Sequence, residues 1–167
     1  FGRLWNQYSI KEITLEMVSN ESGVTTRTIM RKFGSKEGLL TESLPILNAH
    51  VEAQRKVTKA GDIDAVLQAL LSNYESMGEA SIRTINLASE LEIARKIGHK
   101  GRELHRNWCI QMFSQYLPEQ NTPEFEIQLN SFIAATEIYL WKLMRKDLKL
   151  SREKTLAIFK NMIEGLV

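Results

Sequence analysis

Apolar residues recur along much of the chain with the three- and four-residue spacing of α-helices. No stretch keeps the two-residue alternation that a β-strand would show. The clearest stripe follows Asp62, which suits a helix N-cap. Its members are Ile63, Val66, Leu67, Leu70, Leu71 and Tyr74. The pattern predicts an all-α protein whose helices each bury one face.

Two helices are predicted near the C-terminal end, over about 123–146 and 151–166. The first opens at Thr122-Pro123, since proline is favoured in the first helical turn. The second has Ser151 as its N-cap. Both ranges contain apolar residues at helical spacing.

The segment 87–117 also has a helical pattern, but it contains Gly98 and Gly101. Each glycine costs about 1 kcal/mol relative to alanine in a helix interior. We therefore expect either a kinked helix or a break at this point.

A shorter pattern near the N-terminal end predicts two helices joined by a glycine turn. A helix over Leu15–Ser22 follows Thr14, a plausible N-cap, and Gly23 provides the positive φ that a sharp turn needs. Thr25 can cap a second helix over about 26–32. This order is that of the helix-turn-helix motif, whose second helix enters the major groove of DNA.

The apolar side of this motif is expected to consist of Val18, Val24, Ile29 and Phe33. The other side carries hydroxyl and cationic groups. Arg27 can donate two hydrogen bonds to guanine O6 and N7. Ser35 can cap a third helix, whose free amides would hold a phosphate together with the Lys36 ammonium. The candidate DNA-binding residues are Thr14, Thr25, Thr26, Arg27, Thr28, Met30, Arg31, Lys32 and Lys36.

Residues 4–40 resemble the DNA-binding domain of the TetR family of bacterial transcriptional regulators. The resemblance lies in spacings that agree without a gap: Thr14-Leu15, Val18-Ser19, Gly23-Val24-Thr25, Thr28-Ile29-Met30, Phe33, Ser35-Lys36-Glu37 and Leu39-Leu40. Met30 replaces the family's usual tyrosine and cannot donate its hydrogen bond to phosphate. Ser9 stands where a glycine usually ends the first helix, of which only the last turns, about Leu4 to Tyr8, are expected here.

The resemblance implies a long helix from about Lys36 to Val57 and two domains, with the first helix of the DNA-binding domain truncated. Residues 1–44 would form the helix-turn-helix DNA-binding domain, and 45–167 a larger helical domain for ligand binding and dimerisation. The predicted helices at 123–146 and 151–166 would form the homodimer interface. An unknown small-molecule ligand would bind between helices, with Trp108, Met112, Phe132 and Tyr139 as candidate pocket residues.

Composition adds little to this interpretation. The formal net charge is +2, and residues 1–60 carry nine Lys and Arg against six Asp and Glu. This excess is weak support for DNA binding. His50, His99, His105 and the single Cys109 lack metal-ligand spacing, so structural or solvated positions are expected and no metal or other cofactor is predicted. No run of about 18 apolar residues predicts a membrane span, and a cytoplasmic protein is expected.

The leading hypothesis is a homodimeric transcriptional regulator that binds a double-stranded DNA operator, more specifically a repressor that a small-molecule ligand releases from the operator. One alternative is a helix-turn-helix protein controlled by a protein partner, which a filled C-terminal core would favour. Another is a small all-α ligand carrier or enzyme. No nucleophile–base pair or phosphate loop supports an enzyme, so catalytic activity is not expected.

Overall fold

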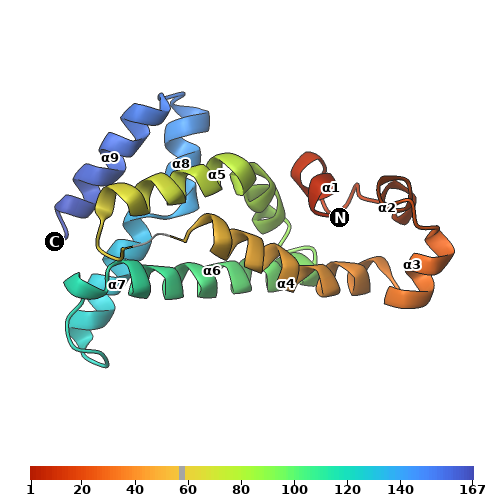
Figure 1. Cartoon of the computed structure of the whole chain (residues 1–167), viewed down its shortest axis with the longest axis horizontal. Helices are drawn as coiled ribbons and strands as arrows, with labels where there is room; N and C mark the ends of the chain where they lie inside the picture. The colour runs from red at the N-terminus through yellow and green to blue at the C-terminus, as the bar shows by residue number, and fades with distance from the viewer. Residues whose placement is uncertain (57–58) are drawn as a thin grey trace. The chain divides into compact units, whose positions relative to one another are not determined.

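The computed structural model describes residues 1–56 and 59–167, and in these residues it contains helices but no strand. This confirms the all-α prediction. In chain order the elements are α1 (Gly2–Gln7), α2 (Leu15–Ser22), α3 (Thr26–Phe33), α4 (Lys36–Gln54), α5 (Ile63–Asn86), α6 (Glu92–Met112), η1 (Ser114–Tyr116), α7 (Pro123–Ala135), α8 (Ile138–Lys142), η2 (Leu143–Asp147) and α9 (Arg152–Glu164) (Figure 1). None of the helices in the described ranges has an apolar stretch that could cross a membrane.

The chain forms two compact units that do not follow the sequence in two simple blocks. The first unit contains Phe1–Val51 and Glu79–Gly101, and the second contains Glu52–Gly78 and Arg102–Val167. The boundaries fall inside α4, α5 and α6, so each of these helices contributes residues to both units. The predicted division after residue 44, with DNA binding assigned to residues 1–44 and ligand binding and dimerisation to residues 45–167, stays a prediction.

In the first unit, α1 is fixed to the last turns of α5 by its tryptophan and by an arginine. The Trp5 indole Nε1 donates to Thr84 Oγ1 at 2.7 Å, and both side chains are buried. Arg83 Nη2 donates to the carbonyl oxygens of Trp5 at 3.1 Å and Asn6 at 2.8 Å. These bonds satisfy carbonyl groups at the end of α1, which are left without helical partners.

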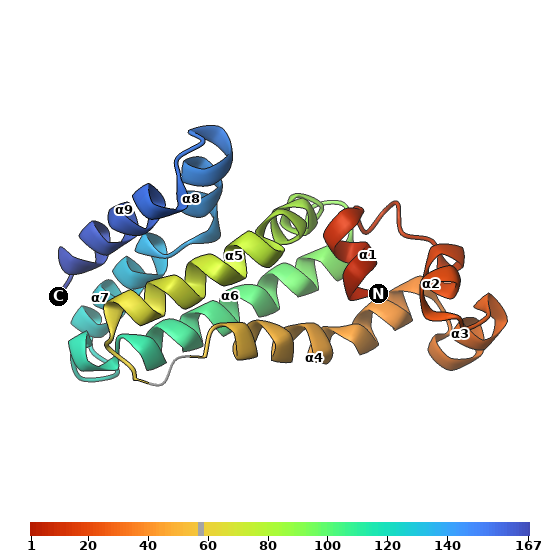
Figure 2. The ribbon, with the colours of Figure 1, turned by 45° about the horizontal axis from the view of Figure 1, so that its top comes forward.

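The second unit has a large aromatic and aliphatic core. Phe113 and Phe132 stack with ring centroids 4.4 Å apart, and Trp108 meets Phe113 edge-on at 6.0 Å. The stripe predicted after Asp62 lies in α5, where Val66, Leu67, Leu70, Leu71 and Tyr74 are all buried. α7 and α9 lie against one another in this unit (Figure 2).

The single helix predicted over 123–146 is wrong, because the chain leaves the helix after α7. Tyr74 Oη donates to the carbonyl oxygen of Thr136 at 2.7 Å, and the Thr136 hydroxyl donates to Phe132 O at 2.7 Å. Glu137 then has extended backbone angles (φ −69°, ψ 144°), and α8 and the π-helical turn η2 follow. The helix thus ends where a tertiary hydrogen bond from Tyr74 takes up the Thr136 carbonyl group and the Thr136 hydroxyl bonds back to its own helix, at a residue that looked like part of a continuous stripe.

Two other helices differ from expectation in their extent. α6 continues without interruption through Gly98 and Gly101. Packing of the buried face of α6 therefore offsets the unfavourable helix propensity of the two glycines. The helix expected to run from Lys36 to residue 57 ends at Gln54, and residue 57 lies outside the described residues.

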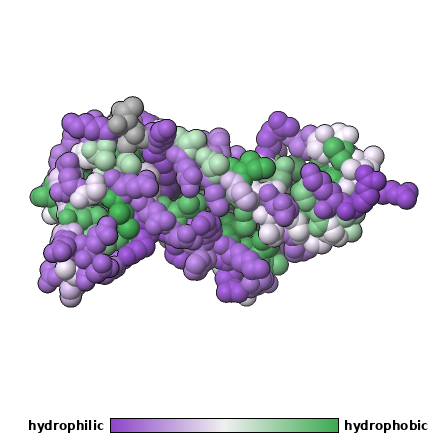
Figure 3. Space-filling model, turned by 60° about the horizontal axis from the view of Figure 1, so that its bottom comes forward, coloured by the Kyte–Doolittle hydropathy of each residue, from purple (hydrophilic) through white to green (hydrophobic). Residues whose placement is uncertain are grey.

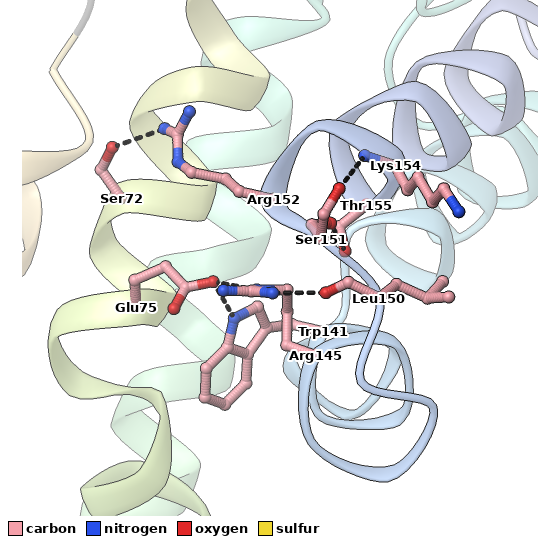
Figure 4. Close-up of polar contacts among 9 residues, drawn as sticks. All are labelled: Ser72, Glu75, Trp141, Arg145, Leu150, Ser151, Arg152, Lys154 and Thr155. Carbon is pink, nitrogen blue, oxygen red and sulfur yellow. Dashed lines mark hydrogen bonds and ion pairs between the residues drawn. The ribbon is translucent and has the colours of Figure 1, made fainter.

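An arginine and a tryptophan from the last third of the chain converge on Glu75 of α5 (Figure 4). Arg145 Nε donates to Glu75 Oε1 at 2.5 Å, and Trp141 Nε1 donates to the same oxygen at 3.3 Å. Burial opposes ionisation of the Glu75 carboxyl, but these hydrogen bonds outweigh it and lower its pKa. Arg145 also donates to the carbonyl oxygen of Leu150, so it ties α5 to the segment before α9.

Gly78 of α5 lies directly against the Trp141 ring. A Cβ atom at this position would be 2.5 Å from Trp141 Cζ3 and 2.7 Å from Cη2. We expect Gly78→Ala to lower the free energy of unfolding by about 1–3 kcal/mol through overpacking, although alanine is the better helix former. Urea denaturation followed by circular dichroism at fixed protein concentration measures this change.

Gly101→Ala is the matched control, because a Cβ atom at Gly101 of α6 would meet nothing within 4 Å. This variant should be more stable than the original protein by up to about 1 kcal/mol. Equal effects of the two substitutions would mean that the contact between Gly78 and Trp141 does not limit the packing of α5.

Candidate nucleic-acid interface

Side-chain caps and glycines define the ends of the two helices in the predicted helix-turn-helix motif. Thr14 Oγ1 accepts from Met17 N at 3.1 Å, and Thr25 Oγ1 accepts from Thr28 N at 3.3 Å, which confirms both predicted N-caps. Gly23 follows α2 with a φ of 69°, as expected for a left-handed residue after a helix end. α2 and α3 are therefore joined by a short turn (Figure 1).

The apolar side of the motif is buried only in part as predicted. Val18 of α2 and Ile29 of α3 are buried in the first unit, and Phe33 is partly buried. Val24 was expected to face inward, but it is 41% exposed. It lies in the extended turn between Gly23 and the cap Thr25, where neither helix covers it.

The outward side of α3 combines cations, hydroxyls and one thioether. Arg27, Arg31 and Lys32 are exposed, and no acidic residue occurs between Ser22 and Lys36. Thr25, Thr26 and Met30 are also exposed, whereas Thr28 is partly buried. Hydrophilic side chains project from the surface formed by α2 and α3, with hydrophobic ones among them (Figure 3). This surface has the composition that contacts to phosphates and base edges require.

The N-terminus of α4 adds a second cationic position. Ser35 Oγ accepts from Gly38 N at 3.0 Å, so Ser35 caps α4 as predicted. Lys36 is partly buried, and its Nζ donates to the carbonyl oxygen of Lys11 at 3.3 Å. Burial lowers the pKa of the Lys36 ammonium, and Glu37 partly opposes this shift. The amine is thus held at the start of α4, where the helix dipole also favours an anion.

Sequence reasoning missed the residues that position Lys36. Lys11 supplies its carbonyl oxygen to Lys36 and forms an ion pair with Glu90 through its own side chain. Glu90 is 79 residues away in sequence, so no local pattern could have revealed this pair. It connects the segment between α1 and α2 with the segment that precedes α6.

The four predicted pocket residues lie in different surroundings. Trp108 and Phe132 are buried and both contact Phe113. Met112 is partly buried, whereas Tyr139 is 46% exposed. The structure therefore brings two of the four residues into one aromatic cluster, and their role in ligand binding stays a prediction.

A buried polar cluster beside these aromatic residues was also missed. Arg55 is buried, although it lies just after the end of α4. Its guanidinium Nε donates to Asn73 Oδ1 at 2.8 Å, and Nη1 is 3.0 Å from His105 Nδ1. His105 was predicted to be structural or solvated, and it is part of this cluster. In the described ranges, no group of three His, Cys, Asp or Glu residues could hold a metal ion.

Comparison with protein families gives a match at the N-terminal end of the chain. Residues 3–42 match the family model described as bacterial regulatory proteins, tetR family. This range contains α1 except Gly2, all of α2 and α3 and the start of α4, and therefore the candidate DNA-binding residues described above. Neither the comparison with curated proteins nor the comparison with solved structures gives a significant match.

Proposed function

We propose that the chain is a homodimeric repressor of the tetR family of bacterial regulatory proteins, and that a small-molecule ligand releases it from its operator. The match of residues 3–42 to that family supports a DNA-binding transcriptional regulator. Residues 1–44 would bind DNA, and residues 45–167 would bind the ligand and the second subunit. Such a regulator would act in the cytoplasm, where bacterial DNA lies.

The exposed side of α3 is the observation that supports the mode of DNA binding. Arg27 would read a guanine in the major groove, while Thr14, Thr25, Thr26, Thr28, Met30, Arg31 and Lys32 would contact neighbouring bases and phosphates. Lys36 would bind a phosphate at the N-terminus of α4. In this arrangement the two α3 helices of a dimer contact half-sites about 34–36 Å apart, or a multiple of that spacing.

Apolar side chains on α7 and α9 support the homodimer. Ile127 of α7 is 69% exposed, and Ile158 and Met162 of α9 are 38% and 37% exposed. Ile158 and Met162 are one helical turn apart, so they lie on the same side of α9. Large apolar residues that gather on adjacent helices are typical of a subunit interface.

Ile158→Glu combined with Met162→Glu should convert the dimer into monomers. Two carboxylates in an apolar interface would lose hydration without gaining partners, and the dissociation constant should rise at least about a hundredfold, which corresponds to about 2.8 kcal/mol. Sedimentation velocity over a concentration series measures this constant.

Ala157→Glu places a glutamate on α9 about 100° around the helix from Ile158, and it is the control for each of the two added carboxylates. Ala157 is exposed, so this variant should fold normally and remain dimeric. Dissociation by both variants, or by neither, would place the subunit interface elsewhere.

Ligand release would follow from a difference in affinity between two conformations. The ligand must bind more tightly to the conformation whose two α3 helices do not fit the operator, and the shift cannot exceed this difference. The aromatic cluster around Trp108 and Phe132 is the candidate region for binding. Helical bundles commonly bind ligands between helices lined by such side chains.

Selection of bound sequences from random duplex DNA with the full chain tests the proposed function. We expect enrichment of a palindromic site whose half-sites are separated by one helical turn of DNA or a multiple. Enrichment of an unpaired site would contradict the dimeric arrangement. Absence of any enriched sequence would contradict operator binding itself.

A further inference from the structure

Arg55 is a buried cation whose direct side-chain contacts in the second unit are with polar and aromatic residues rather than with a carboxylate. Only 9% of this residue is exposed, and its guanidinium forms side-chain hydrogen bonds to Asn73, His105 and Tyr74. The guanidinium also lies over the rings of Tyr74 and Trp108, at 5.0 Å and 5.6 Å from their centroids. None of the ion pairs found among the described residues includes Arg55.

His105 is a neutral hydrogen-bond partner of Arg55 and does not balance its charge. Arg55 can only donate, so His105 Nδ1 accepts and the proton lies on Nε2, which is 3.0 Å from Thr136 Oγ1. Burial, and then the nearby Arg55 charge, lower the pKa of His105 to about 3. The ring therefore stays neutral near pH 7.

No acidic residue forms an ion pair with Arg55 among the ion pairs of the described residues, although the Arg55 charge acts on Glu137. Glu75 forms its ion pair with Arg145. Glu137 is partly buried, and burial raises the pKa of its carboxyl, against the opposing effects of the Ile138 amide, Arg55 and Arg102. A buried cation without a bound anion is costly, and such groups are usually paired or bind a ligand.

We propose that the second unit binds a small organic anion, with a carboxylate as its charged group, through the guanidinium of Arg55. This inference rests on the proposed function and names the chemical class of the releasing ligand. Asn73, His105 and Tyr74 take three of the five guanidinium N–H groups, and the planar fork suits two-point contact with a carboxylate through the others. The aromatic rings of Tyr74 and Trp108 supply apolar surface beside the charge.

A chain of polar side chains connects this cluster with the surface of the second unit. Asn73 Nδ2 donates to Gln54 Oε1 at 2.6 Å, and Gln54 Nε2 is 3.4 Å from the hydroxyl of the exposed Ser76. Gln54 itself is partly exposed. An anion can approach Arg55 along this chain if Gln54 exchanges its bond to Asn73 for a bond to the ligand or to water.

The test compares carboxylates with amides of the same carbon skeleton in the full chain. The probes are octanoate against octanamide and benzoate against benzamide, and Trp fluorescence and thermal unfolding give their dissociation constants. We expect at least one acid to bind tenfold or more tightly than its amide and to raise the Tm. Equal binding of acid and amide in both pairs, or no binding by either acid, would overturn the proposal.

Three arginine variants test whether the preference for the acid over the amide depends on Arg55. Arg55→Gln should reduce the ratio of acid to amide affinity to below twofold, whereas Arg106→Gln should keep it, because Arg106 forms an ion pair with Glu126 on the surface. Arg55→Lys keeps the charge and should keep part of the ratio if Arg55→Gln fails to fold. Two results would contradict binding at Arg55. One is a ratio of acid to amide affinity that is unchanged in Arg55→Gln. The other is a ratio that is kept in Arg106→Gln but lost in Arg55→Lys, with no rise in the Tm of Arg106→Gln when the acid is added.

The DNA selection separates this proposal from the proposed function. If the full chain enriches an operator but neither acid binds, the organic anion is wrong and the regulator stands. If an acid binds through Arg55 but no sequence is enriched, operator binding is wrong and the anion site stands.

Discussion

Trp141→Ala is expected to lower the free energy of unfolding by about 3–5 kcal/mol, the range for large aromatic residues removed from a core. Trp141 is 1% exposed, faces Gly78 and lies 6.1 Å from the Tyr74 ring centroid. Its loss leaves a cavity beside α5, which the helix cannot close without moving. It also removes one of the two hydrogen bonds that converge on Glu75. Urea denaturation at fixed protein concentration measures the loss.

Two comparisons isolate the packing contribution. Tyr139→Ala removes an exposed aromatic residue from the same helix and should change the stability by less than about 0.5 kcal/mol. Gly78→Ala should be neutral or stabilising once Trp141 has been replaced, because the added methyl group then enters the cavity. If Gly78→Ala costs as much in the Trp141→Ala background as in the original protein, the two positions are independent and their close contact does not limit stability.

Arg27→Ala should weaken operator binding by about 1–3 kcal/mol and relax the preference for one base pair. The expected loss follows from removing a two-point contact to guanine. Lys36→Ala should instead weaken binding to all duplexes alike and reduce the slope of log affinity against log salt by about 1. Titrations of labelled operator and of an unrelated duplex, at several salt concentrations, distinguish the two effects.

Arg95→Ala is the control for both variants. Arg95 lies in the first unit and is exposed like Arg27, but it is on α6 and forms an ion pair with Glu92. It should leave operator affinity and the salt slope unchanged. If Arg27→Ala and Lys36→Ala also leave operator affinity unchanged, the proposed docking of α3 and α4 on DNA is wrong.

Local patterns were sufficient where one segment determines its own structure. The caps Thr14, Thr25 and Ser35 and the left-handed Gly23 were predicted from residue type and spacing, because each bond joins residues at most four apart. The same holds for the stripe of α5. The prediction that Val24 faces inward was wrong. Burial of a turn residue depends on whether another helix packs over it, and the local sequence does not show this.

Contacts between distant segments account for the other differences. At the break after α7, the Tyr74 hydroxyl donates to the carbonyl oxygen of Thr136, which is 62 residues away in sequence. Lys11 and Glu90 hold the position of Lys36 from 79 residues apart. Neither contact leaves a periodic signal, since hydrophobic spacing reports only which face of a helix is apolar.

The sequence alone therefore determined that the chain is helical, where α2, α3 and α9 begin, and which residues form the cationic side of the helix-turn-helix motif. These features depend on backbone hydrogen bonds and spacing within one or two turns. Only the tertiary structure decided that Arg55 is buried among Asn73, Tyr74 and His105. The reason is that an isolated arginine in sequence resembles any solvated one, and its burial arises only when separate helices supply polar and aromatic partners.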